Sequence, residues 1–253
     1  MPTFMTPDRR KLGRLPSPPD SRTLQLSRYM PAIQEPPPSY YDTAPQIITT
    51  PTWSNTRFGD CTVAARANQC LVEDSAHAAA PILDPQLVID EYFELTGFHD
   101  TGLSMRVALN HWRKSPFLNT RPIHAYAAIS PTNAELIRES IYTFGSAYIA
   151  LNMPTAWRGA HTWTRGQGHA YAPGSWGAHC VALIAYDPTE VIALTWGARQ
   201  PITWPALAYY CDEAYAVLGP DWCDINMHSP SGIDLATLRA DLAAIDTEPT
   251  PQD

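Results

Sequence analysis

The first half of the chain carries apolar residues at the spacing of helices. In residues 61–74, Val63, Ala67, Cys70 and Leu71 fall on one face, as a buried helix requires. A second helix is predicted over residues 85–95, because an aspartate precedes it, a proline opens it and a glycine follows it. A third is predicted over residues 104–114, where four apolar residues share a face: Met105, Ala108, Leu109 and Trp112.

The second half of the chain changes to the alternation of strands. Residues 121–129 alternate apolar and other positions, and residues 147–152 and 179–186 form apolar runs of the length of buried strands. Further strands are predicted at residues 191–195, near 200–203 and at 214–218. Helices are expected at 131–144, after a capping Ser130, at 204–211 and at 234–245, and residues 154–174 are expected to form a long loop.

The two ends of the chain differ from this central part. Residues 1–50 form a proline-rich arm, since residues 1–51 hold 11 of the 25 prolines. The arm is a linker, a disordered tail, or a segment that wraps its own domain or a neighbour. Its apolar and aromatic residues favour wrapping over disorder. A helical part, 51–120, a strand-rich part, 121–226, and an acidic tail, 227–253, complete the expected division.

Composition excludes several classes of function. The chain has 253 residues, 45% of them hydrophobic, which is enough for one large domain or two small lobes. A formal net charge of -8 argues against nucleic-acid binding, and no apolar run is long enough for a membrane span. The five cysteines include no CxxC pair, so we expect reduced thiols in a cytoplasmic setting, no zinc and no cofactor.

Cys61 is the first candidate for chemistry. Gly59 and Asp60 form a turn, so Cys61 falls in the first turn of the predicted helix, where unpaired backbone N–H groups favour a thiolate. Asp60 can act as the N-cap, although a carboxylate beside the thiol would also raise its pKa. The pattern favours the capping role.

His179 is the histidine best placed to act as a base. It follows the glycine-containing run 174–178 and begins the apolar strand up to Tyr186. Glycines around it allow another segment to approach closely, and the strand fixes the ring. Taken alone, such a histidine is more often structural. Together with a cysteine at a helix start in the other half, it predicts a Cys–His pair across a cleft.

These residues resemble the motifs of the papain-like cysteine peptidases over roughly residues 50–220. Asn55 stands six positions before Cys61, where papain-type enzymes usually have Gln. Gly177-Ala178-His179-Cys180-Val181 matches their histidine motif, and Thr195-Trp196-Gly197 matches the Trp-Gly that closes the next strand. The resemblance implies an α+β, two-lobed fold, with a helical lobe carrying the Cys and an antiparallel β-barrel-like lobe carrying the His.

The chain looks closer still to a group of papain-like proteins of bacteriophages, prophages and bacteria. The shared segments are residues 55–61, 195–197 and Asp212–Val217, with the proline-rich entry Leu12–Pro16. This resemblance implies a cytoplasmic or virion-associated protein whose arm contacts phage structural proteins.

One position departs from the papain pattern. The family has an Asn just before Ser-Trp-Gly that orients the histidine, and here that position is Leu194. Thr195 is adjacent and polar, but strand alternation directs it to the opposite face from Leu194. A backbone carbonyl, a shifted side chain or no third member are the alternatives. The candidate catalytic residues are therefore Cys61, His179, Asn55 and Thr195.

Three functions follow from this site. The first is a thiol hydrolase, a peptidase or an isopeptidase/amidase acting on a peptide or protein, in which Asn55 and the Cys61 backbone N–H form the oxyanion site. The second is a catalytically weak or inactive papain-like scaffold, serving as a phage virion or accessory protein. The third is an acyl or transglutaminase-type transferase that uses the same pair.

Overall fold

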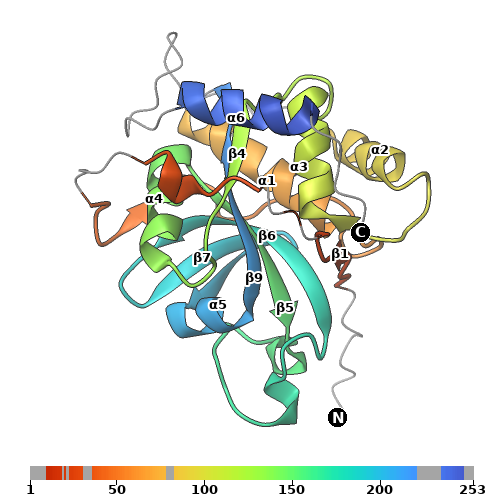
Figure 1. Cartoon of the computed structure of the whole chain (residues 1–253). Coiled ribbons are helices and arrows are strands. Elements are labelled where there is room, and N and C mark those ends of the chain that lie inside the picture. The colour runs from red at the N-terminus through yellow and green to blue at the C-terminus, as the bar shows by residue number, and fades with distance from the viewer. Residues whose placement is uncertain are drawn as a thin grey trace.

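The computed structural model of the chain describes residues 10–18, 20, 23–30, 36–77, 83–220 and 235–247. Most of the acidic tail predicted over 227–253 lies outside these residues, apart from α6 (Leu235–Thr247). The described molecule combines a group of helices with one large, mainly antiparallel sheet (Figure 1).

Three helices of the first half lie together on one side of the molecule (Figure 1): α1 (Cys61–Ala76), α2 (Pro85–Leu95) and α3 (Met105–Lys114). Their bounds agree with the sequence prediction to within two residues. Asp84 caps α2 as expected, because its carboxylate accepts the backbone N–H of Gln86 at 2.8 Å. α1 is buried along nearly its whole length, and it packs against the sheet.

The sheet has the strand order β4-β9-β5-β6-β7-β8, and every pair in this order is antiparallel. Its strands are β4 (Ala125–Ala128), β5 (Ala147–Met153), β6 (Gly177–Tyr186), β7 (Glu190–Thr195), β8 (Ala198–Thr203) and β9 (Cys211–Leu218). The short strand β2 (Tyr41–Asp42) pairs with β6. The strands β5, β6 and β9 are central and largely buried, as their apolar runs predict.

Two helices connect the strands. α4 (Ala134–Phe144) begins three residues later than predicted, because Asn133 is the N-cap and accepts the N–H of Leu136 at 3.1 Å. Ser130 instead bonds to the neighbouring Thr132, so the predicted Ser130 cap was wrong. α5 (Trp204–Tyr210) follows β8, and 3-10 turns η2 (Thr155–Trp157) and η3 (His169–Tyr171) lie in the long loop.

The described part of the N-terminal arm packs against its own chain. The short strand β1 (Arg14–Leu15) pairs in parallel with β3 (Leu103–Ser104), and the 3-10 turn η1 (Leu26–Arg28) follows. Leu26 is fully buried, and the Tyr29 hydroxyl donates to Asp241 of α6 at 2.7 Å. In these residues the arm wraps the domain, which is the alternative that its apolar content favours.

Candidate active site

Cys61 begins α1 and is fully buried where this helix meets β6. The backbone N–H groups of Cys180 and Gly13 both hydrogen-bond to its Sγ. Cys180 directly follows His179 on β6, so the sulfur lies against the strand that carries the predicted base. The fold therefore brings together the two motifs, which are 118 positions apart in the sequence.

The thiol of Cys61 is not activated in this arrangement. Burial raises the pKa of Cys61 to about 11, and the neighbouring Asp60 also raises it, against the lowering effect of the two backbone N–H groups. The helix start predicts a thiolate, but the thiol is fully buried, and its desolvation outweighs the effect of the helix N-terminus.

Asp60 occupies the N-cap position of α1 without capping it. No helix N–H donates to its side chain; its Oδ1 instead accepts the Asn55 Nδ2–H at 2.8 Å. Asn55 also donates to the Phe58 carbonyl oxygen at 3.2 Å, so both protons of its amide are engaged. The predicted capping by Asp60 was wrong, and burial raises the pKa of this carboxyl to about 7.

His179 is fully buried on β6 and is held by Thr195 at the end of β7. Its Nε2 lies 2.6 Å from the Thr195 Oγ1. Ala182 pairs with Leu194, so these two residues share a face of the sheet. His179 is three residues before Ala182 and therefore points to the opposite face, which is the face of Thr195.

Leu194 consequently does not contact the imidazole from the family's orienting position. Its side chain is buried in a second apolar cluster, and its carbonyl accepts the Asn68 side-chain N–H at 3.2 Å. The orienting group could be a backbone carbonyl, a shifted side chain or absent. The geometry favours the shifted side chain, that of Thr195, one residue after Leu194. The Nδ1 of His179 has no hydrogen-bond partner among the residues that the structure describes.

The turn between β7 and β8 covers the imidazole with an aromatic ring. Trp196 and Gly197 are its central residues, with positive φ of 47° and 83°, as in a tight hairpin turn of primed type. The Trp196 ring stacks on His179, with centroids 4.0 Å apart and planes 10° from parallel. A left-handed backbone is unusual for tryptophan, and here it directs the indole onto the histidine.

The N-terminal arm crosses this site. The Arg10 guanidinium lies 5.1 Å from the centroid of the Trp196 ring and 5.0 Å from that of Trp176. The Lys11 N–H donates to the Asn55 backbone oxygen at 2.9 Å, and the Gly13 N–H reaches Cys61. The arm therefore covers the cysteine and lies beside the stacked Trp196–His179 pair. Burial, and then Arg10, lower the pKa of His179 to about 3.

Gly13 fits this path because it lacks a side chain. A Cβ on Gly13 would lie 1.8 Å from the Gly59 carbonyl oxygen, and a Cβ on Gly102 would lie 2.2 Å from the Gly13 oxygen. The Leu103 N–H also donates to the Gly13 oxygen at 2.9 Å. This contact was not predicted from the sequence. A single glycine between two bulky residues, Leu12 and Arg14, is the sequence signal of such a close backbone approach.

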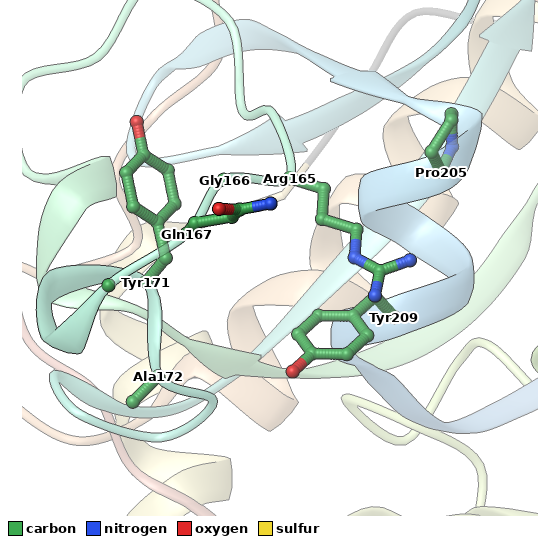
Figure 2. A pocket seen from close by; sticks show the side chains of 8 residues that line it. Arg165, Gly166, Gln167, Tyr171, Ala172, Pro205 and Tyr209 are labelled. Atoms are coloured by element: carbon green, nitrogen blue, oxygen red, sulfur yellow. The ribbon is translucent and has the colours of Figure 1, made fainter.

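A separate hollow of about 580 Å³ lies between the long loop and α5 (Figure 2). The Arg165 guanidinium lies 4.1 Å from the centroid of the Tyr209 ring there. None of the residues that line this hollow belongs to the candidate catalytic set.

The described residues contain no group of three or more His, Cys, Asp or Glu side chains arranged to hold a metal ion. Four of the five cysteines are described, and all four are free thiols. Within the same part of the chain, no helix has both the length and the apolar content needed to cross a bilayer.

Comparison with solved structures identifies the fold. Xylellain, a cysteine protease from Xylella fastidiosa, matches with a TM-score of 0.59 at 13% identity, over 86% of this chain and 99% of its own. Procathepsin L2 proteinase from Tenebrio molitor larval midgut matches with a TM-score of 0.57 at 11% identity, over 86% and 82%. Procathepsin B from Trypanosoma congolense matches with a TM-score of 0.55 at 10% identity, over 83% and 87%.

The chain therefore has the fold of the papain-like cysteine proteases, an α+β arrangement of helices against a mostly antiparallel sheet. No protein-family model matches the sequence, and no curated protein sequence matches it. At 10–13% identity the likeness establishes the fold, while the chemistry depends on the residues of this chain.

Proposed function

We propose that the protein is a papain-like thiol hydrolase, a cysteine peptidase or an isopeptidase/amidase, acting on a peptide or protein substrate. One observation carries the proposal: the Cys61 sulfur at the start of α1 lies against the residue that follows His179, whose ring is held by Thr195 and covered by Trp196. A nucleophile, a base and an orienting group in this relation are what amide hydrolysis by a thiol requires.

Each residue has a defined role in this proposal. His179 takes the thiol proton, the Cys61 thiolate attacks the carbonyl carbon, and the C–N bond breaks as His179 returns the proton to the leaving amine. Water, deprotonated by His179, then hydrolyses the Cys61 thioester and restores the thiol. With Nε2 committed to Thr195, Nδ1 is the nitrogen available for this proton transfer. The Cys61 backbone N–H and the Asn55 amide stabilise the oxyanion, and Asn55 releases its long bond to Phe58 to do so.

The arm controls whether this pair can act. Covered by residues 10–13, the pair is a neutral thiol and a neutral imidazole, because burial raises the pKa of Cys61 and lowers that of His179. Removing the cover readmits water to both groups. Readmitted water moves both pKa values toward their ordinary range, which allows the thiolate–imidazolium pair to form.

The test is peptide hydrolysis by the full-length chain carrying Gly13→Ala, which cannot keep the covered arrangement without moving the backbone. We expect this variant to hydrolyse a mixed fluorogenic peptide library, and Gly13→Ala/Cys61→Ala to be inactive. Equal rates with and without Cys61 would eliminate the thiol mechanism.

The second candidate is a papain-like scaffold that binds without catalysis. The raised pKa of Cys61 and the apolar Leu194 at the family's orienting position favour it. A Cys61→Ala chain that keeps the full biological function would support the scaffold over the enzyme. The transferase alternative is separated from hydrolysis by a product assay with an added amine acceptor.

The resemblance to phage-encoded proteins, with phage structural partners for the arm, stays a prediction of the sequence, as does a cytoplasmic or virion location.

A further inference from the structure

Cys180 is a buried thiol that the proposed mechanism does not use. It directly follows His179 on β6, and only 2% of it is exposed. Its backbone N–H donates to the Cys61 sulfur, so the two cysteines are in direct contact through this hydrogen bond. The fold therefore places a second thiol-bearing residue against the candidate nucleophile.

Strand register directs the Cys180 side chain toward α1. Tyr148 of β5 pairs with Ala182 of β6, which is two residues after Cys180, so these three side chains point to one face of the sheet. The Tyr148 hydroxyl donates to the Thr62 carbonyl oxygen at 2.8 Å, which identifies this face as the one that α1 covers. The Cys180 side chain is hydrogen-bonded to Tyr148. The Cys180 thiol thus lies under the first turn of α1, the helix that begins at Cys61.

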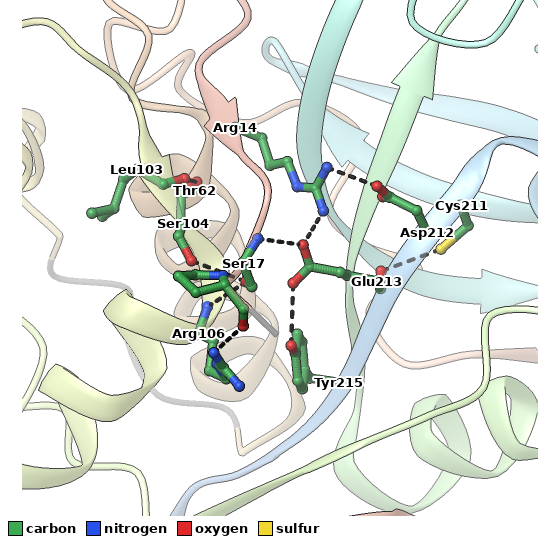
Figure 3. Close-up of polar contacts among 11 residues, drawn as sticks. Arg14, Ser17, Thr62, Leu103, Ser104, Arg106, Cys211, Asp212, Glu213 and Tyr215 are labelled. Carbon is green, nitrogen blue, oxygen red and sulfur yellow. Dashed lines mark hydrogen bonds and ion pairs between the residues drawn. The ribbon is translucent and has the colours of Figure 1, made fainter. Parts of the chain in front are cut away.

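Thr62 fixes this first turn of α1 over the thiol. Its hydroxyl donates to the Leu103 carbonyl oxygen at 2.9 Å, and Figure 3 shows the two residues side by side. Cys61 directly precedes Thr62, so the same turn sets its position. The Cys180 sulfur is joined through its own Cα and Cβ to the nitrogen that contacts the Cys61 sulfur. Rotation about the side-chain bonds of the two cysteines therefore changes the distance between the sulfurs without moving either backbone.

The other two described cysteines lie too far from Cys61. Cys70 is on the same helix at the ninth position after Cys61, which corresponds to about 13.5 Å along the axis, whereas a disulfide requires Cα atoms within about 7 Å. Cys211 pairs with Leu151, which in turn pairs with His179, so two strand spacings, roughly 10 Å, separate Cys211 from β6. Of the cysteines that the structure describes, Cys180 is the one within reach.

We propose that Cys61 and Cys180 form a redox-active pair, which hydrogen peroxide converts into a disulfide with Cys180 as the resolving thiol. The formation of this disulfide does not depend on the proposed hydrolase function. Its consequence for activity does rest on that function: the enzyme loses its nucleophile reversibly and avoids the irreversible oxidation of Cys61 to a sulfinic or sulfonic acid.

The reaction has two steps. His179 takes the Cys61 proton and the thiolate attacks one peroxide oxygen: the S–O bond forms, the O–O bond breaks, and the leaving hydroxide takes the proton from His179 to give water. The Cys180 sulfur then attacks the sulfur of the Cys61 sulfenic acid: the S–S bond forms, the S–O bond breaks, and the leaving hydroxide takes the Cys180 proton to give a second water. The two sulfurs lose two electrons and the peroxide gains them. A dithiol reductant reverses the linkage by thiol–disulfide exchange.

The first experiment identifies the oxidised product. Full-length Gly13→Ala, in which the cover of Cys61 is displaced, is treated with hydrogen peroxide at rising concentration until Cys61 is consumed. The remaining thiols are blocked with N-ethylmaleimide. Trypsin then releases Cys61 in residues 58–66 and Cys180 in residues 166–199, and each of these peptides contains a single cysteine. We expect the main product to be these two peptides joined by a link that dithiothreitol breaks. Recovery of Cys61 mainly as an unlinked oxidised acid, or joined to another cysteine, overturns the proposal.

The second experiment tests whether Cys180 protects Cys61. Cys180→Ser is prepared in the same background, and Cys211→Ser is the matched control, because it also removes one buried thiol of the sheet. After peroxide and then dithiothreitol, we expect roughly tenfold more Cys61 to remain as sulfinic or sulfonic acid in Cys180→Ser than in the control. Cys180→Ala removes the thiol without adding a buried hydroxyl and should behave like Cys180→Ser. Equal amounts of the acids in all three variants contradict the resolving role.

The outcomes separate this inference from the proposed function. Linkage of the two peptides without any Cys61-dependent hydrolysis removes the enzyme and keeps the thiol pair. Cys61-dependent hydrolysis by a chain in which peroxide consumes Cys61 without linking it to Cys180 keeps the enzyme and removes the pair.

Discussion

At the scale of single residues, the histidine is held by a hydroxyl instead of an amide. The Thr195 Oγ1 lies 2.6 Å from the Nε2 of His179, and we propose that this hydroxyl orients the ring. A hydroxyl can donate or accept, so it selects the tautomer less strictly than an amide carbonyl does. When it accepts the Nε2–H, Nδ1 is left unprotonated and able to act as the base.

Replacing Thr195 tests this role. In the Gly13→Ala background, Thr195→Val keeps the shape and removes the hydrogen bond, and we expect kcat to fall roughly tenfold or more with little change in KM. Thr195→Ser retains the hydroxyl and is the matched control, which should keep most of the activity. A Val variant as active as the Ser variant would show that Thr195 only packs against the ring.

At the scale of elements, the arm and the β7–β8 turn close the site from two sides. The turn supplies Trp196, and the arm supplies Arg10, whose guanidinium lies over the same ring. The arm is held by backbone bonds to Asn55 and Leu103 and by a contact that tolerates only glycine at position 13. A single methyl group added at position 13 is therefore expected to displace the arm from the site.

The rate at which Cys61 is alkylated measures directly how well the arm protects the thiol. We expect Cys61 to react with iodoacetamide at neutral pH at least about a hundredfold faster in Gly13→Ala than in the unmodified chain, because release of the arm exposes the thiol and lowers its pKa. Gly219→Ala is the matched control, since a Cβ there meets its nearest atom, the Glu73 Oε1, at 3.5 Å. The site of labelling is read by peptide mass spectrometry. Similar Cys61 rates in both variants would mean that the arm does not guard the thiol.

At the scale of the whole molecule, two buried titratable groups make stability depend on pH with opposite signs. The pKa of His179 is lowered to about 3, so its neutral form belongs to the folded state, and acid below its unfolded pKa weakens the fold. The pKa of Asp60 is raised to about 7, so the folded state retains a proton that the unfolded chain releases near pH 4. Its contribution is present below that unfolded pKa and is lost as pH rises through about 7.

Asp60→Asn isolates the second effect. We expect the free energy of unfolding of the unmodified chain, relative to Asp60→Asn, to fall as pH rises from about 4 to about 7. Asp187→Asn is the matched control: the Thr189 hydroxyl and nearby backbone N–H groups lower the pKa of Asp187, so its contribution is lost only below about pH 4 and the stability relative to Asp187→Asn should stay flat from about pH 4 to about 7. Urea unfolding at a series of pH values provides the comparison. A relative stability that rises over this interval would contradict the burial of a protonated Asp60.

The sequence by itself determined the elements and the two halves of the site. Helical spacing located α1, α2 and α3, apolar runs located β5, β6 and β9, and motif spacing selected Cys61 and His179. These features are local, because side-chain periodicity and turn residues act within a few positions of the chain.

Only the tertiary structure decided the state of the site. The register between β6 and β7 places the Thr195 hydroxyl, and not the Leu194 side chain, beside His179. The path of the arm places Gly13 against Cys61 and pairs Arg14 with Glu213. Register depends on pairing between strands, and the arm's path depends on contacts as distant as the 199 positions between Arg14 and Glu213. The pKa values follow from burial, which exists only once these segments have packed together.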